Sequence, residues 1–141
     1  KELEARTVDS VNPGEEQNER DHELKGDKTA SGDFNDSKWR HASDGGWFSY
    51  DVKVLPGKPQ ELCVTYWGSD AGGREFDILV DGERVATQTL NRDKPDQLFD
   101  ARYAIPERFT RGKERVTVKF QAHPGRTAGG VFGVRVLKPR E

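Results

Sequence analysis

The sequence predicts an all-β domain, either an antiparallel β-sandwich or a jelly roll of roughly eight to ten short strands. Three observations support this prediction. Apolar side chains return at every second position in several separate runs, which is the period of strands with one buried face. Proline, glycine and asparagine turn signals separate these runs at short intervals. No segment has the apolar stripe of a long helix.

The alternation is clearest in residues 47–82, around which the rest of the chain is organised. Residues 55–59 cannot continue a strand because two prolines lack the amide donor, and Asp81-Gly82 suits a tight hairpin turn. By parity, Trp47 and Trp67 point away from the buried face. The side chains that we expect to face the core are Phe48, Tyr50, Val52, Val54, Leu62, Val64, Tyr66, Phe76, Ile78 and Val80.

Before residue 47 the alternation is weaker. A short strand over residues 6–11 ends at the turn signal of residues 12–14. Residues 15–23 are too polar for a core helix, so we expect a loop or an exposed turn that leads into a strand near residues 22–26. The remaining predictions are a loop over residues 28–37, which are rich in Gly, Ser, Asp and Asn, a short strand over 38–42, and a turn over 43–46.

After residue 82 the alternation resumes. Residues 106–113 allow at most one helical turn, since Pro106 suits its first position and Gly112 suits its end. The predicted strands cover residues 84–90, 99–105, 115–121 and 132–136, the last with Phe132, Val134 and Val136 in its alternating apolar set. The charged ends, residues 1–6 and 138–141, are expected to be solvated tails.

Length predicts one domain, residues 1–141. Lysine and arginine number 23 against 25 acidic residues, and the net charge of −2 with interspersed signs predicts neither a nucleic-acid nor a membrane partner. No apolar stretch is long enough to span a bilayer. Because the sequence has no methionine, we expect a piece excised from a larger protein, with any export signal upstream.

The sequence predicts no catalytic centre. It contains no nucleophile elbow, no HExxH helix and no phosphate-binding loop. Cys63 is the only cysteine and lies within a strand, which favours a buried, inert thiol. The three histidines are far apart, which favours loop-anchoring roles over a zinc site. Asp70, Glu75 and Asp77 could supply a glycosidase pair, but in a chain with 25 acidic residues solvated faces are the favoured interpretation.

Aromatic and polar residues near glycine-rich turns predict a sugar site. Aromatic rings at a loop rim stack on the C–H faces of sugars, while polar groups bind the hydroxyls. The alternatives are that the tryptophans pack against a neighbouring domain and that the arginines only order the loops. The candidates are Trp39, Trp47 and Trp67 for stacking, Asp70, Arg74, His123 and Arg126 for hydrogen bonds to hydroxyls or a uronate, and Asp21 and Glu23 as weak candidates for calcium.

Five segments carry a resemblance to a known family: residues 47–52, 66–70, 74–82, 120–125 and 128–133. They resemble the C-terminal β-sandwich module of bacterial β-L-arabinofuranosidase-like glycoside hydrolases. The resemblance covers about residues 8–137, and the entry of the module is similar to residues 17–26 with Asp21-His22. The order of the strands is also similar to galactose-binding-like, jelly-roll carbohydrate-binding modules, although their calcium pattern is not matched.

The resemblance implies that catalysis lies elsewhere in a parent enzyme, because the family's zinc centre requires several cysteines. It also implies a secreted or periplasmic protein. The leading hypothesis is therefore a non-catalytic, carbohydrate-binding accessory domain of a glycoside hydrolase that acts on plant-type polysaccharide, with no cofactor except a possible calcium ion. The alternative is a structural domain that packs against the parent catalytic domain and binds no sugar itself.

Overall fold

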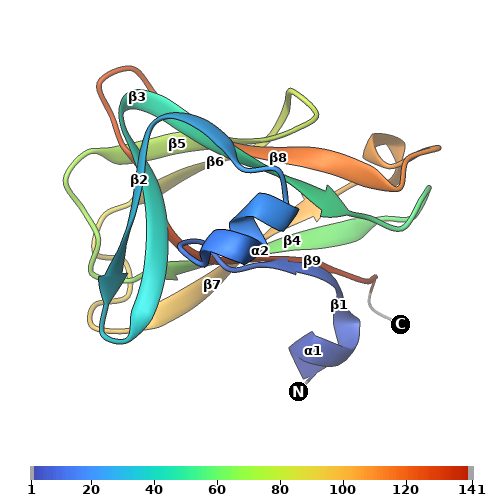
Figure 1. The fold of residues 1–141 in the computed structure, drawn as a ribbon, viewed down its shortest axis with the longest axis horizontal. Helices are drawn as coiled ribbons and strands as arrows, with labels where there is room; N and C mark the ends of the chain where they lie inside the picture. Colours follow the sequence, from blue (N-terminus) through green and yellow to red (C-terminus); the bar gives the residue numbers. More distant parts are fainter. Residues whose placement is uncertain (1, 140–141) are drawn as a thin grey trace.

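The computed structural model describes residues 2–139, which form an all-β antiparallel fold with two layers (Figure 1). Most of these residues lie in strands, and residues 2–139 also form two short α-helices and one 3-10 turn. The elements are α1 (Glu2–Arg6), β1 (Thr7–Val11), α2 (Glu16–Asp21), β2 (Lys25–Phe34), β3 (Ser37–Lys53), β4 (Gln60–Trp67), β5 (Arg74–Val80), β6 (Glu83–Leu90), β7 (Leu98–Ile105), η1 (Glu107–Phe109), β8 (Arg115–Ala122) and β9 (Ala128–Leu137).

The strands form one hydrogen-bonded sheet that folds over into a nearly closed jelly roll. Its order is β6-β5-β8-β3-β9-β4-β7, with β1 added to β9 and β2 added to β3. The long strand β3 joins the two layers, because residues 40–42 pair with β9 whereas residues 47–53 pair with β8. Asp44 and Gly45 have positive φ between these halves. The predicted turn over residues 43–46 is therefore wrong, and the chain bends there within one continuous strand.

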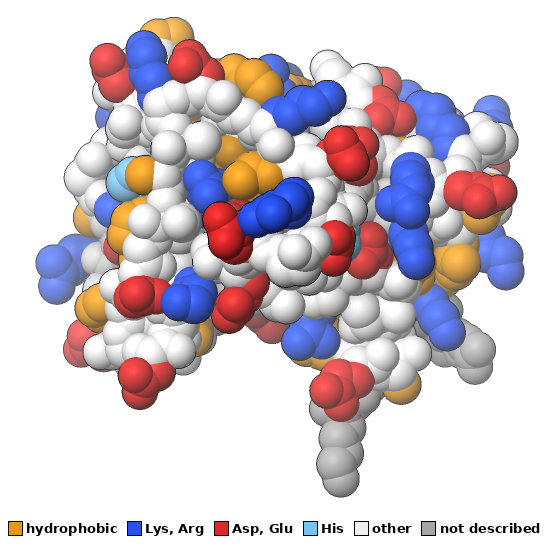
Figure 2. All heavy atoms as spheres, in the orientation of Figure 1, with side chains coloured by type: hydrophobic (Ala, Val, Ile, Leu, Met, Phe, Trp, Pro, Cys, Tyr) orange, Lys and Arg blue, Asp and Glu red, His pale blue; other side chains and the backbone are white. Residues whose placement is uncertain are grey.

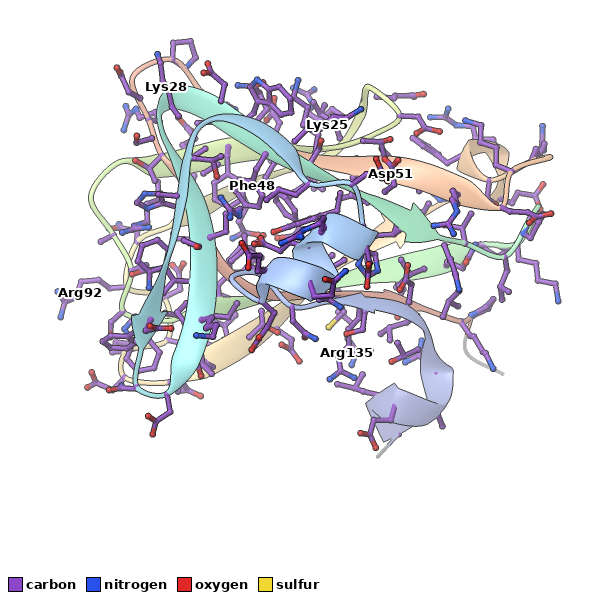
Figure 3. All side chains as sticks on the ribbon, viewed as in Figure 1. Lys25, Lys28, Phe48, Asp51, Arg92 and Arg135 are labelled. Atoms are coloured by element: carbon purple, nitrogen blue, oxygen red, sulfur yellow. The ribbon has the colours of Figure 1, made fainter. Side chains whose placement is uncertain are left out.

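The core lies between the layers and contains the side chains that the alternation predicts. Phe48 and Phe120 stack with ring centroids 5.0 Å apart, and both are fully buried. Figure 3 shows Phe48 between the layers and Arg92 pointing away from one end of them. Cys63 is also buried, as predicted, and burial raises the pKa of its thiol.

Three predictions for the N-terminal part are wrong. Residues 28–34 belong to strand β2 rather than to a loop, and residues 2–6 form helix α1 rather than a tail. Residues 16–21 form helix α2, whose Glu19 is buried. The tail predictions for Lys1, Arg140 and Glu141 lie outside the described residues.

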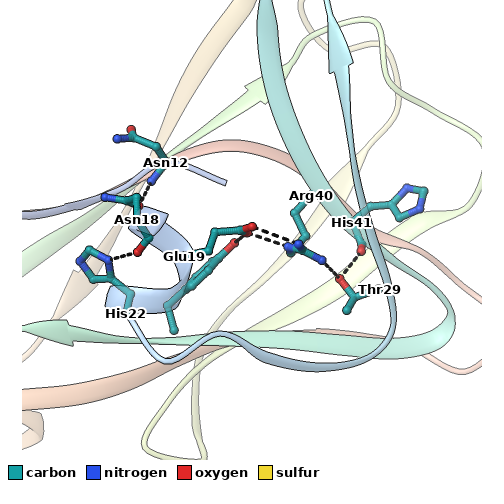
Figure 4. A network of polar contacts seen from close by, with 8 residues as sticks. Asn12, Asn18, Glu19, His22, Thr29, Arg40 and His41 are labelled. Carbon is teal, nitrogen blue, oxygen red and sulfur yellow. Dashed lines mark hydrogen bonds and ion pairs between the residues drawn. The ribbon is translucent and has the colours of Figure 1, made fainter. Parts of the chain in front are cut away.

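Helix α2 forms because Glu19 has buried partners on β3 (Figure 4). Its carboxylate accepts hydrogen bonds from Arg40 Nε at 2.7 Å, Arg40 Nη2 at 3.0 Å and the Tyr50 hydroxyl at 2.6 Å. Burial alone would raise the pKa of Glu19, but the hydrogen bonds from Arg40 and Tyr50 outweigh burial and lower it. This network lies beside a cavity of about 650 Å³, which Glu19 and Arg40 help to line.

Both ends of the sandwich core lie side by side. Thr7 at the start of β1 pairs with Leu137 at the end of β9, and Figure 1 shows α1 beside the end of β9. On the face drawn in Figure 2, acidic and basic side chains are interspersed, and no large area of one sign is seen. None of the helices formed by residues 2–139 has the length and apolar character that a membrane-crossing helix requires.

Candidate functional site

A cavity of about 330 Å³ opens where the tip of the β2–β3 hairpin meets the end of β4. We call it the aromatic cavity, because four of its seven lining side chains are aromatic. Its volume lies at the lower end of the range of small-ligand sites, about 300–1,000 Å³. It is lined by Asp33, Phe34, Trp39, Trp67, Asp70, Arg74 and Phe132.

The hairpin supplies one wall of the aromatic cavity. Trp39 lies opposite Gly32 on the paired strand, and its indole covers the glycine so closely that a Cβ at Gly32 would overlap the ring. His41 lies beside Trp39, with ring centroids 4.9 Å apart. Burial, together with the nearby charge of Arg74, lowers the pKa of His41, so a neutral imidazole accompanies Trp39 at pH 7. The indole is thus fixed on one side and half-exposed on the other.

The end of β4 supplies the opposite wall. Tyr66 points into the core and Trp67 points out, as the parity of the strand predicts. Phe34 packs edge-on against Trp67, with centroids 5.1 Å apart and ring planes at 61°. Phe34 remains 40% exposed, which is unusual for so large an apolar side chain in the described residues. Apolar rings therefore face solvent from both walls.

The polar groups of the cavity are Asp70 and Arg74. Arg74 donates hydrogen bonds from Nε to the Ala71 carbonyl and from Nη1 to the Gly129 carbonyl, both at 2.8 Å. Its Nη1 lies 3.7 Å from Asp70 Oδ2, too far for a hydrogen bond. Burial raises the pKa of Asp70, and the charge of Arg74 opposes this effect. Among residues 2–139 no group donates a hydrogen bond to the Asp70 carboxylate, so its acceptor capacity is unused.

Two glycine-rich loops, residues 68–74 and 123–130, meet at this end of the sandwich. The amide of Thr127 donates to the Gly73 carbonyl at 3.1 Å, and Arg74 forms a parallel bridge with Thr127. The alternative hypothesis, that the arginines order the loops, also applies to Arg74. Its guanidinium donates hydrogen bonds to Ala71 in one loop and to Gly129 in the other. In this geometry Arg74 orders the loops and at the same time lines the cavity.

Of the seven predicted sugar contacts, the structure brings Trp39, Trp67, Asp70 and Arg74 together. Trp47 lies on the outer face of β3, under the Lys119 ammonium at 4.4 Å from its ring centroid. The other two lie nearby but outside the aromatic cavity. His123 binds Glu75 and Asp77, and Arg126 lines a neighbouring cavity.

His123 bridges two carboxylates on the outer face of β5. Its Nε2 lies 2.8 Å from Asp77 Oδ1, and its Nδ1 lies 3.2 Å from Glu75 Oε1. The hydrogen bond to Asp77 is the main reason that the pKa of His123 is raised above its ordinary value of 6.5. The stabilisation from this pairing is fully present below pH 6.5 and is lost as the pH rises through the raised pKa. Asp77 and His123 therefore have an anchoring role.

We expect an NMR titration to place the pKa of His123 above 6.5 and to return it toward that value in Asp77→Asn, because the variant removes the charged partner. His41 is the internal control, since burial lowers its pKa and the two imidazoles should titrate apart. A His123 pKa at or below 6.5 in the unmodified protein would contradict the bridge.

Sequence reasoning missed Asp33, Phe34 and Phe132. The first two directly precede Asn35 and Asp36, which have positive φ values of 49° and 63° and form a two-residue hairpin turn. This Asn-Asp pair is the signal that could have revealed the hairpin. Phe132 was expected in the alternating apolar set. A register shift places it in a bulge between β9 and β4, so Val131 is buried and Phe132 lines the cavity.

The calcium candidates do not come together. Asp21 accepts a hydrogen bond from Gln17 at 2.8 Å, and Glu23 lines the cavity of about 650 Å³ beside Arg20 and Arg40. Within residues 2–139 there is no group of three or more His, Cys, Asp or Glu side chains that could hold a metal ion.

The fold is that of family 35 carbohydrate-binding modules. One such module from Clostridium thermocellum superposes with a TM-score of 0.65 at 14% identity, over 92% of this chain and 98% of the module. Another, from Paenibacillus barcinonensis, gives a TM-score of 0.59 at 10% identity, over 82% of this chain and 93% of that one. These similarities confirm the predicted jelly-roll sandwich.

The same fold occurs within a larger enzyme. A crystal structure of exo-β-1,3-galactanase from Phanerochaete chrysosporium with β-1,3-galactotriose superposes with a TM-score of 0.62 at 11% identity, over 90% of this chain but 28% of the enzyme. No curated protein matches the sequence. Residues 2–137 match a family described as a family of unknown function (DUF6805), and because this match covers nearly the whole sequence, the chain belongs to that family.

Proposed function

We propose that this chain is a carbohydrate-binding domain that holds a sugar ring in the aromatic cavity. The observation that supports this most is the Asp70 carboxylate, which lines the cavity together with Trp39 and Trp67 and accepts no hydrogen bond from residues 2–139. A half-buried carboxylate without donors is costly unless a ligand or water supplies them. Vicinal sugar hydroxyls can supply two donors in the plane of a carboxylate.

The surrounding rings suit the rest of a sugar. Trp39 and Trp67 offer half-exposed apolar faces, against which the C–H face of a pyranose or furanose can pack while its hydroxyls point to Asp70. Arg74 is held in place by the Ala71 and Gly129 carbonyls and directs a cation toward the same space. Because these groups are fixed before binding, little ordering is required when the ligand enters.

We further propose that the domain is a non-catalytic accessory part of a secreted or periplasmic glycoside hydrolase acting on plant-type polysaccharide. The shared fold with family 35 carbohydrate-binding modules and with part of a galactanase supports this role. The resemblance of residues 47–52 and 66–70 to the C-terminal module of β-L-arabinofuranosidase-like enzymes favours an enzyme of that kind as the parent.

The test is affinity electrophoresis of the purified domain on arabinan, arabinoxylan, galactan and xylan, with three tryptophan variants beside it. We expect one polymer to retard the domain, and Trp39→Ala and Trp67→Ala to weaken this binding by about 2 kcal/mol, roughly 30-fold, as for a central aromatic contact. Trp47→Ala is the matched control, because Trp47 lies on the outer face of β3 and should leave retardation unchanged.

Near-UV circular dichroism of each variant establishes that it is folded. If no polymer retards the unmodified domain, the proposal of sugar binding is rejected, and the exposed rings are then better explained as a surface that packs on a parent catalytic domain. Equal loss in all three variants would reject the aromatic cavity as the binding site.

A further inference from the structure

A second cavity adjoins the aromatic cavity and shares one residue with it. This polar cavity has a volume of about 350 Å³, close to that of its neighbour. Arg74 lines both, so this residue lies at the border between the two spaces. The polar cavity is lined by Gly73, Arg74, Glu75, Thr89, Leu90, Asn91 and Arg126.

The boundary between the two cavities is rigid. The guanidinium of Arg74 is fixed by two hydrogen bonds of 2.8 Å, to the Ala71 and Gly129 carbonyls. The loop that follows Trp67 is tied to the β6–β7 connection, because the Arg92 amide donates to the Asp70 carbonyl at 2.9 Å. The two cavities therefore keep a fixed relative position, and a ligand that fills both must match that spacing.

The polar cavity offers hydrogen-bonding groups without aromatic surface. The backbone of Arg126 is held on both sides, by its amide to the His123 carbonyl at 2.8 Å and by its carbonyl to the Gly45 amide at 3.0 Å. Its exposed guanidinium has no hydrogen-bond or ion-pair partner among residues 2–139 and passes close to Gly73. The carboxamide of Asn91 and the hydroxyl of Thr89 are exposed and likewise unpaired within the described part of the chain.

We propose that the ligand is an oligosaccharide of at least two residues, which spans Arg74 and fills both cavities. One sugar ring packs against the tryptophans, and its neighbour lies in the polar cavity, where Arg126 and Asn91 donate hydrogen bonds to its hydroxyls. This inference rests on the proposed function, and it assigns the second cavity a role in recognising chain length. Because the polar cavity has no ring to stack on, it adds affinity only to a sugar already held in the aromatic cavity.

The test is isothermal titration calorimetry, which measures the affinity of the intact domain for three monosaccharides and three disaccharides. The sugars are arabinose, galactose and xylose, and α-1,5-arabinobiose, β-1,3-galactobiose and β-1,4-xylobiose. We expect one disaccharide to bind at least tenfold more tightly than its own monosaccharide. Arg126→Ala should remove this gain and leave the affinity for the monosaccharide unchanged. Arg84→Ala is the matched control, since Arg84 is an exposed arginine near the opposite end of β6.

The outcomes separate the two proposals. Equal affinities for a monosaccharide and its disaccharide would contradict the placement of a second sugar residue in the polar cavity. The proposed function would still stand. If Arg126→Ala keeps the higher affinity for the disaccharide, this assignment of the polar cavity is also contradicted. Failure of all six sugars to bind the folded domain would reject the proposed function together with this inference.

Discussion

Glu19→Ala is expected to destabilise the domain by about 3–5 kcal/mol, the effect of removing one partner of a buried ion pair. The side chain of Glu19 is 5% exposed and that of Arg40 is 11% exposed, so the variant leaves a guanidinium buried without its counter-ion. It also leaves the Tyr50 hydroxyl without its acceptor. Urea unfolding followed by tryptophan fluorescence gives the free energy of unfolding by linear extrapolation to zero urea.

Two further variants make this prediction specific. Glu19→Leu with Arg40→Met should recover most of the loss, because removing both charges leaves no uncompensated ion. Glu107→Ala, which breaks the exposed pair with Arg111, should cost no more than about 1 kcal/mol. If Glu19→Ala lowers the free energy of unfolding as little as Glu107→Ala does, the buried ion pair contributes no more to stability than the exposed one.

The same pair predicts how stability depends on pH. The pKa of Glu19 lies below its ordinary value of 4.5 in the folded protein, because hydrogen bonds from Arg40 and Tyr50 outweigh burial. Its contribution is therefore present above pH 4.5 and is lost as the pH falls through the lowered pKa. The difference in free energy of unfolding between the unmodified domain and Glu19→Ala should shrink over that acidic range.

Gly68→Ala is expected to destabilise the domain by about 3 kcal/mol, the upper end of the usual range for overpacking. Gly68 joins two loops at the aromatic cavity: its amide donates to the Gln97 carbonyl at 2.7 Å, and its carbonyl accepts from the Lys94 amide at 3.2 Å. A Cβ at this position would overlap the Lys94 carbonyl, which is backbone and cannot rotate away. The two loops must separate to admit it.

Thermal unfolding of Gly68→Ala beside Gly133→Ala tests this expectation. A Cβ at Gly133 would meet Thr65 Oγ1 at 3.4 Å, an ordinary contact, so this control should change stability by less than about 1 kcal/mol. Because Gly68 directly follows Trp67 and precedes Asp70 by two residues, we also expect Gly68→Ala to weaken sugar binding where enough folded protein remains. Equal unfolding midpoints for the two variants would contradict the close packing of Gly68 against the Lys94 carbonyl.

The strands with clear alternation could be predicted from the sequence, because their periodicity reflects burial between the two layers. Strand β2 could not, since most of its residues are exposed and carry no apolar alternation, and its partner is β3 alone, which it meets through the turn at Asn35 and Asp36. Helix α2 was missed for a related reason. Its single buried side chain, Glu19, is charged, and its partners Arg40 and Tyr50 are 21 and 31 residues away in the chain.

Only part of the candidate site could be predicted from the sequence, namely the part that depends on local strand parity and on the glycine-rich loop. Strand parity alone placed Trp67 outside the core, and the glycine-rich loop placed Asp70 and Arg74 beside it. Trp47 obeys the same parity rule but lies on the face of the other layer, next to Lys119, because β3 passes from one layer to the other. Local patterns do not reveal which outward-facing residues meet after such a crossing.

The pairing of Thr7 with Leu137 has a practical consequence. Leu137 also pairs with Glu61 at the start of β4, whereas Trp67 ends that strand six residues later, about 20 Å away at 3.3 Å per residue. A tag or linker fused at either end of the sandwich therefore attaches far from the aromatic cavity. Immobilisation on a sensor surface through either terminus should leave the cavity mouth unobstructed. The adjacent ends also permit circular permutation, with the chain reopened at the exposed turn around Gly57.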